Sequence, residues 1–211
     1  MLRRLVVSLV VIAGLLVAAD FGLRLYSEHV VAKEVQRSLH LSERPSVSFG
    51  GWPFVPHAMS GNLPSATVTA KNFSKAGLRL QTVSLDLHAL HFPSHRLITG
   101  GRGVIHAKTG TASAVLTPAD LDATLHSEGL PLSVSIRQGR VSAKVGSLSV
   151  GLDLKLDGNT LVLSPAALGA ASARIGLPVV VAGMRYTSLK VTGDHLELSG
   201  ELKNATFLVP G

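Results

Sequence analysis

Few side chains in this sequence are of a type and spacing that could do chemistry, and histidine is the main one. The densest cluster is His88, His91 and His95, and imidazole is both the commonest metal ligand and a side chain that titrates near neutral pH. His88 and His91 are three residues apart on a predicted strand, so we expect them on opposite faces of its sheet. Pro93 separates both from His95. The cluster therefore does not predict a metal site.

Motifs of familiar enzymes are also missing from the sequence. There is no G-x-S-x-G, no H-E-x-x-H and no P-loop. The chain has no cysteine, which excludes thiolate nucleophiles, disulfides and Cys-based metal sites. Gly100-Gly101-Arg102-Gly103 could form an anion-binding backbone nest, or it could be a plain turn between strands. Because no acid/base constellation can be assembled, we expect a protein that is not an enzyme and that needs no cofactor.

The most unusual stretch is the segment from Gly50 to Gly61, with the sequence GGWPFVPHAMSG. Its two prolines, Pro53 and Pro56, predict neither an ordinary helix nor an ordinary strand. It contains the one tryptophan of the chain and crowds four large apolar side chains together, namely Trp52, Phe54, Val55 and Met59. Such a segment is either a plug in the core or an apolar lip that is exposed for a reason. The sequence leaves both interpretations open.

The N-terminus has the pattern of a targeting segment. Arg3 and Arg4 precede an apolar run of 15 residues, from Leu5 to Ala19, which is in the range of a signal peptide and short for a full membrane span. Cleavage before Asp20 and an uncleaved anchor are both open. In either case we expect residues 20–211 to be exported to the cell envelope, either anchored or secreted. The predicted organisation is a signal or anchor over 1–19 and one domain over 20–211.

Composition and charge limit the class of partner. Hydrophobic residues make up 46% of the chain and charged residues 16%, so disorder is not expected. Aromatic residues make up only 4%, which argues against a protein that stacks single-stranded nucleic acid. Residues 1–115 contain 12 Lys/Arg and 5 Asp/Glu, whereas residues 116–211 contain 8 of each. The basic N-terminal half suits an anionic partner such as a lipid surface, although it could also be ordinary solubilising charge.

Helical periodicity covers residues 21–41 and is followed by strand patterns. The helix is predicted to carry one apolar stripe, which Glu28 interrupts, and to pack on a sheet or lie on a membrane; the stripe contains Phe21, Leu25, Ala32, Val35 and Leu39. The longest predicted strand covers residues 78–90, and its apolar alternation changes phase near Gln81-Thr82. Such a change is typical of a β-bulge and predicts a strongly curved sheet.

The remaining predicted elements are mostly hairpins. Thr117-Pro118-Ala119-Asp120 predicts the start of a helix that ends near Ser127. A short Ala-rich helix is expected over 165–174. The predicted strands are 46–49, 63–70, 104–116, 132–137, 141–145, 148–156, 161–163, 186–191, 195–202 and 206–209.

The proline-rich segment also carries a family resemblance. The run Gly51-Trp52-Pro53-Phe54-Val55, followed by Met59 to Leu63 and Val68-Thr69-Ala70, resembles the G-[FW]-P-F-L…L-x-G…V-x-V-x-A opening of the LmeA-like phospholipid-binding family of bacterial envelopes. Pro56-His57 departs from the family's frequent Thr-Gln. The resemblance implies an α+β fold similar to tubular (BPI-like) lipid-binding domains, with a long curved antiparallel sheet rolled around a helix. It also implies non-enzymatic phospholipid binding, linked to envelope glycolipid biosynthesis or lipid transport.

These expectations define three groups of candidate residues. A pocket mouth or membrane-contact lip would contain Trp52, Phe54, Val55 and Met59, and the lining would contain Leu78, Leu80, Leu85 and Leu87. Head-group or membrane-surface contacts would come from Lys71, Lys75 and Arg79, which could equally be solvated. The expected partners are an anionic phospholipid and the outer surface of the cytoplasmic membrane, not nucleic acid. The alternative is a structural or protein-interaction module whose sheet is filled by its own side chains.

Overall fold

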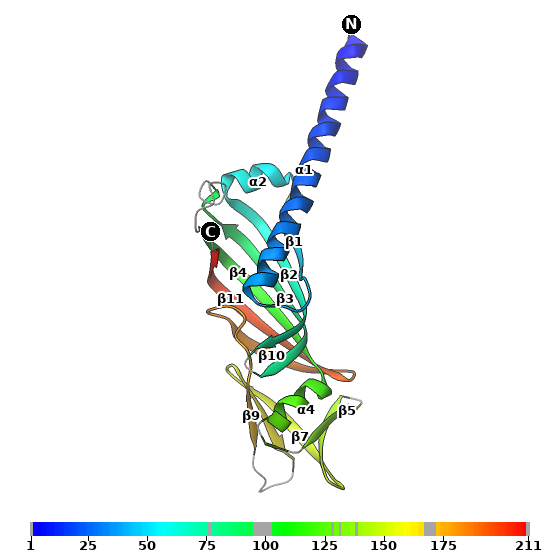
Figure 1. Cartoon of the computed structure of the whole chain (residues 1–211), viewed down its shortest axis with the longest axis vertical. Helices are drawn as coiled ribbons and strands as arrows, with labels where there is room; N and C mark the ends of the chain where they lie inside the picture. The colour runs from blue at the N-terminus through cyan, green and yellow to red at the C-terminus, as the bar shows by residue number, and fades with distance from the viewer. Residues whose placement is uncertain are drawn as a thin grey trace.

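The chain folds as an α+β protein with one very long N-terminal helix and two antiparallel sheets (Figure 1). This computed structural model describes residues 2–75, 77–94, 103–127, 129–130, 132–137, 139–166 and 172–209. Helix α1 (Leu2–Ser38) leads into the large sheet, and the small sheet lies at the opposite end of the molecule from the N-terminus. The predicted fold class is therefore confirmed at the level of helix and antiparallel sheet.

The large sheet has six strands in the order β1-β2-β3-β4-β11-β10. Their bounds are β1 (Ser46–Gly50), β2 (Asn62–Lys75), β3 (Leu78–His91), β4 (Gly103–Leu116), β11 (His195–Val209) and β10 (Arg185–Thr192). The small sheet has five strands in sequence order, namely β5 (Ser133–Arg137), β6 (Arg140–Val145), β7 (Leu148–Asp157), β8 (Thr160–Pro165) and β9 (Ala173–Gly176). Two shorter helices lie wholly within the described residues, α2 (Phe54–Ser60) and α4 (Pro118–Ser127).

Several predicted elements need correction. The one curved sheet that the sequence suggested is two sheets, because the hairpins after α4 pair among themselves. The separate last strand over 206–209 is the end of the long strand β11. The Ala-rich helix over 165–174 is wrong at both ends, since Pro165 ends β8 and Ala173 begins β9. Its centre, 167–171, lies outside the described residues, as do His95 and residues 100–102 of the glycine-rich stretch.

A crease across four strands bends the large sheet. On β3, β4 and β11 two exposed residues separate two buried ones, as at Leu87 and Leu90 of β3 or Leu202 and Ala205 of β11. On β2 the two residues between buried Leu63 and Ala66 are one exposed and one half-buried. The strands stay in register through the crease. Ala89 and Asn204 have left-handed backbone there, with φ of 51° and 50°, which interrupts the extended conformation of a strand. At the crease the alternation of buried and exposed residues shifts by one position along each strand, although no strand contains an extra residue.

A second crease crosses β2 and β3 at the position of the predicted β-bulge. Buried Leu80 and Val83 flank it on β3, and the pairing of Ala70 with Val83 continues unshifted as Phe73 with Leu80. Asn72 is the left-handed residue, with φ of 51°. The predicted phase change is therefore confirmed, but its explanation as a bulge is wrong, because neither strand contains an extra residue.

Helix α1 runs without interruption through the boundary predicted between residues 19 and 20. Its C-terminal half lies along the edge strand β1, where the Glu28 carboxylate accepts the Phe49 N–H at 2.8 Å and Ala32 is buried. Of the predicted stripe, Phe21, Leu25 and Leu39 are exposed. The predicted stripe is confirmed at Ala32 and in part at the half-buried Val35. It is wrong at the other three positions, because the contact with β1 is partly polar and includes Glu28.

Helix α4 connects the two sheets. Thr117 and Asp120 form a reciprocal cap: the Asp120 N–H donates to Thr117 Oγ1, and the Thr117 N–H donates to Asp120 Oδ2, both at 3.3 Å. Leu121 and Leu125 are fully buried between β3 and β5, and the Asp122 carboxylate accepts the Val134 N–H of β5. The predicted start of this helix is confirmed.

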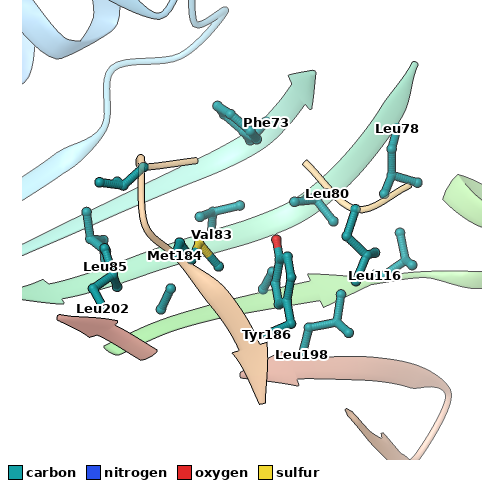
Figure 2. Packing of buried hydrophobic residues seen from close by; sticks show 14 of the residues in the cluster. Phe73, Leu78, Leu80, Val83, Leu85, Leu116, Met184, Tyr186, Leu198 and Leu202 are labelled. Atoms are coloured by element: carbon teal, nitrogen blue, oxygen red, sulfur yellow. The ribbon is translucent and has the colours of Figure 1, made fainter. Parts of the chain in front are cut away.

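An irregular apolar segment, residues 177–184, covers part of the large sheet; we call it the strap. Figure 2 shows Met184, at its end, and Tyr186, just beyond it, among the buried side chains of β3, β4 and β11. The Tyr186 hydroxyl donates to the Pro178 carbonyl at 2.9 Å, and burial raises the pKa of Tyr186 to about 12. Lys75 Nζ donates to the Val179 carbonyl at 2.8 Å. The strap thus packs into the hydrophobic core against the large sheet.

Candidate functional site

Helix α2 forms within the proline-rich segment, where the sequence predicted neither helix nor strand. Pro53 occupies the N-cap with extended backbone, and Pro56 falls in the first turn, where a backbone N–H has no partner inside the helix and proline is tolerated. Gly61 ends the helix with left-handed backbone (φ 72°), and its N–H donates to the Ala58 carbonyl at 3.2 Å. The prediction was wrong because both prolines occupy positions that a helix accepts.

The cap of α2 comes from a different helix. Pro53 has no side chain that can accept a hydrogen bond, and the Asp20 carboxylate of α1 replaces it. Asp20 Oδ2 accepts the Phe54 N–H at 2.9 Å, and Oδ1 accepts the Val55 N–H at 2.7 Å. A carboxylate in this position satisfies free N–H groups and interacts favourably with the positive end of the helix. Asp20 therefore fixes α2 against α1.

Replacing this cap should have a measurable cost. We expect Asp20→Ala to lower the free energy of unfolding by about 1–2 kcal/mol, the usual effect of losing an N-cap. Chemical denaturation of the full chain in detergent measures the change, and Asp153→Ala, at an exposed aspartate, is the matched control. Equal stability of both variants would show that the Asp20 contacts do not hold α2 in place.

The four residues predicted to form a lip divide into two groups. Trp52 is 73% exposed and Met59 is 70% exposed, whereas Phe54 is only 5% exposed and Val55 is half-buried. The Phe54 ring stacks on Phe49 of β1, with centroids 5.7 Å apart. The two interpretations of this segment therefore apply to different residues. Phe54 plugs the core, and Trp52 and Met59 form an exposed apolar lip.

The exposed apolar surface continues from this lip onto α1. The N-terminal half of α1 projects away from the sheets beside α2 (Figure 1), and side chains such as Leu9, Leu16 and Phe21 are exposed on it. By length and composition α1 could cross a membrane, although a signal sequence meets the same criterion. Trp52 and Met59 thus belong to the end of the domain from which the apolar helix emerges.

An open groove of about 420 Å³ lies between α1 and α2. Its lining comes from α1, from α2 and from the residues just after β3, namely Tyr26, Ser27, Val30, Val31, Ala58, Met59, Phe92 and Ser94. The Phe92 N–H donates to the Gly61 carbonyl at 2.9 Å, which holds this wall against the end of α2. Six of the eight lining side chains are apolar or aromatic. The lining therefore suits a hydrocarbon chain, which needs no hydrogen-bond partners from the protein.

The four leucines predicted to line a lipid site lie elsewhere. Leu78 and Leu80 are fully buried and Leu85 and Leu87 are 8% and 5% exposed, so all four point into the same core. Figure 2 shows Leu78, Leu80 and Leu85 within this packed cluster. None of the four lines the groove. In this structure they hold the sheet to the strap and the helices.

The three predicted head-group contacts are far from the lip. Lys71, Lys75 and Arg79 lie where β2 ends and β3 begins, at the opposite end of these strands from α2. Arg79 donates to Asn72 Oδ1 at 2.8 Å and lies 3.9 Å from an Asp120 oxygen. Lys75 is bonded to the strap. The structure therefore does not bring these cations together with Trp52 and Met59.

The histidines do not form a metal centre in the part of the chain that the structure describes. His88 and His91 both lie on the exposed side of β3, so the expectation of opposite faces is wrong; the crease at Ala89 changes the alternation between them. His91 lies 2.7 Å from Asn62 Oδ1. A second open groove, lined by Ile136, Arg137, Gly193 and Asp194, has no group arranged for acid/base work.

The second groove has a titratable pair at its edge, Asp194 and His195. A hydrogen bond between the two side chains raises the pKa of His195 and lowers the pKa of Asp194. Both groups are at the surface turn between β10 and β11, and this is an ordinary exposed ion pair.

The apolar groove beside an exposed apolar helix, on a protein of two antiparallel sheets, has the form of a site for an apolar ligand. Residues 18–201 match the model of the family described as LmeA-like phospholipid-binding, so the chain belongs to that family. The resemblance found in the Trp-Pro-Phe segment is thereby confirmed. No curated protein and no solved structure matches the chain.

Sequence reasoning missed the groove and its support. Val30 and Tyr26 lie in a helix whose apolar stripe was assigned to another face, and Phe92 follows a strand as an isolated aromatic residue. The sequence analysis assigned Asp20 no role beyond its place after a possible cleavage site. Its position could have indicated a polar contact, because Asp20 is the one acidic residue before Glu28 in an apolar helix.

Proposed function

We propose that this protein binds phospholipid at the outer surface of the cytoplasmic membrane, with α1 as anchor or signal and the lip of Trp52 and Met59 in contact with the bilayer. Membership of a phospholipid-binding family supports the ligand class. The observation that carries the membrane contact is the exposure of Trp52 and Met59 beside the emerging apolar helix. Tryptophan suits the membrane interface because its ring is both apolar and able to donate a hydrogen bond.

The role is non-enzymatic. The family is described by binding, and no acid/base constellation was found in the sequence. We further propose that the curved large sheet and its helix are a variant of the tubular lipid-binding architecture, serving envelope glycolipid biosynthesis or lipid transport. Two creases that bend the sheet around a buried core support the likeness. Residues 20–211 then form the exported domain.

An anionic phospholipid is the preferred partner in this proposal. The net positive charge of the chain falls in residues 1–115, the half of the sequence that also contains α1 and α2, and this charge is the basis of the proposed anionic preference. Attraction between such a half and an anionic leaflet acts over about one Debye length, which falls from about 10 Å at 0.1 M salt to about 3 Å at 1 M. Lys71, Lys75 and Arg79 would add to this field only weakly from the far end of the sheet.

The single tryptophan offers a direct test. We expect the fluorescence of Trp52 to be quenched when the full chain is incorporated into nanodiscs of brominated phospholipid, because the indole enters the bilayer interface. Quenching should be stronger with phosphatidylglycerol than with phosphatidylcholine, and the difference should shrink as salt is raised. Emission that stays unquenched in both bilayers would overturn the membrane contact.

The second candidate is a structural or protein-interaction module without a lipid ligand. The observation that favours it is the packed interior, where the strap and the leucines of β3 leave one continuous core. The two candidates differ in whether the purified protein carries phospholipid. A chain that reproducibly binds none, in the mass measurement described below, would favour the module.

A further inference from the structure

The groove between α1 and α2 has two serines in its lining, and the hydroxyls of both are already hydrogen-bonded within the protein. Ser27 Oγ donates to the Leu23 carbonyl at 2.8 Å, and Ser94 Oγ donates to the Met59 carbonyl at 2.9 Å. Tyr26 is exposed, so its hydroxyl stays hydrated at the rim. A polar ligand would have to give up its hydrogen bonds to water on entering and would find few replacements. The lining therefore selects hydrocarbon over a head group.

The position of the groove identifies where that hydrocarbon comes from. Tyr26 and Val30 lie on the same face of α1 as Leu16 and Leu23, because these residues follow one another at spacings of seven, three and four positions. All four side chains are exposed, so an exposed and largely apolar face leads along the helix to the groove. On the opposite wall Met59 is part of the exposed lip. If the lip contacts the bilayer, the groove opens beside the acyl chains. A lipid chain can then enter sideways without crossing water.

We propose that this groove binds one acyl chain of a phospholipid, leaving the second chain in the bilayer and the head group outside. The inference rests on the proposed function and names its site, which differs from the sheet interior suggested by Leu78, Leu80, Leu85 and Leu87. A volume of about 420 Å³ falls near the lower end for small-ligand sites, about 300–1,000 Å³. It therefore suits a single chain better than a whole diacyl lipid. Selectivity among head groups comes from the surface field and not from the groove.

The test fills the groove from either wall and compares lipid occupancy. Val30→Trp adds bulk from α1, and Ala58→Leu adds a smaller group from α2. Leu25→Trp is the matched control, because Leu25 is about as exposed as Val30 (51% and 45%) on the same helix but does not line the groove. Each full chain is purified in detergent, mixed with dioleoyl phosphatidylglycerol and examined by native mass spectrometry. Thermal unfolding confirms that each variant is folded.

We expect the wild type and Leu25→Trp to bind one phospholipid per chain with the same affinity. Val30→Trp should bind it about tenfold more weakly or worse, which corresponds to losing the burial of roughly two methylene groups. Ala58→Leu should weaken binding in the same direction. Lipid held loosely around the apolar helix is common to all four proteins, so the difference isolates the groove.

Two results would overturn the proposal in distinguishable ways. If the wild type binds phospholipid and both groove variants bind it equally well, the groove is not the site, while the proposed function stands. If the wild type binds no phospholipid, both fail together. A dimer mass that disappears in Val30→Trp would also overturn the proposal, because a second copy of the chain would then occupy the groove.

Discussion

Phe54→Ala is expected to lower the free energy of unfolding by about 3–5 kcal/mol, the usual cost of removing a buried phenylalanine ring. The ring is 5% exposed and stacks on Phe49, so its loss leaves a cavity beneath α2 that the capped helix cannot readily close. Denaturant unfolding followed by circular dichroism measures the change. The ring is adjacent to the lip in sequence, but its role is in the core.

Trp52→Ala is the matched variant, two residues away. Because Trp52 is 73% exposed, we expect its replacement to change the free energy of unfolding by no more than about 0.5 kcal/mol, as is usual at the surface. A loss of stability as large as that of Phe54→Ala would contradict the division of this segment into a core plug and a lip. It would show instead that both rings are structural.

Gly61→Ala is the second change with a large expected effect, about 3 kcal/mol or more of destabilisation. Gly61 has φ of 72°, and a Cβ atom there would lie 2.2 Å from the carbonyl oxygen of Phe92. That oxygen belongs to the backbone, so the wall of the groove that carries Phe92 must move. We therefore expect this variant to bind phospholipid more weakly as well as to unfold more easily, as measured by native mass spectrometry and denaturation.

Gly193→Ala separates the two contributions to this effect. Gly193 also has left-handed backbone (φ 58°), but nothing lies within 4 Å of its added Cβ. It should therefore cost only the conformational penalty, about 1–2 kcal/mol, and leave lipid binding unchanged. If the two glycine variants are equally stable, the close approach of Gly61 to Phe92 has no energetic consequence.

Local patterns in the sequence were enough to predict most of the strands and one helix end. The alternation over 78–90 and 104–116 matches β3 and β4, and Thr117-Pro118-Ala119-Asp120 forms the cap of α4. These features depend on neighbours in the chain, since a strand's two faces and a capping side chain are set within a few residues. The family resemblance was also local, because the Trp-Pro-Phe run is distinctive by itself.

The position of the candidate site depended on long-range contacts and could not be predicted in the same way. Asp20 caps a helix 34 residues away, and Glu28 binds the edge of β1. These polar contacts, together with buried Ala32, set which face of α1 meets the sheet. They leave Tyr26 and Val30 facing α2 across the groove.

The sequence by itself determined the class of the protein, the antiparallel strands and the apolar N-terminus, because composition and alternation encode burial directly. Only the tertiary structure decided that Phe54 is core while Trp52 and Met59 are exposed, that the leucines of β3 are packed under the strap, and that Lys71, Lys75 and Arg79 lie at the far end. The reason is physical. The hydrophobic effect is not directional, so an apolar side chain gains a similar free energy from burial against any apolar neighbour. The sequence pattern therefore predicts that such a side chain is buried, but it does not predict which residues it packs against.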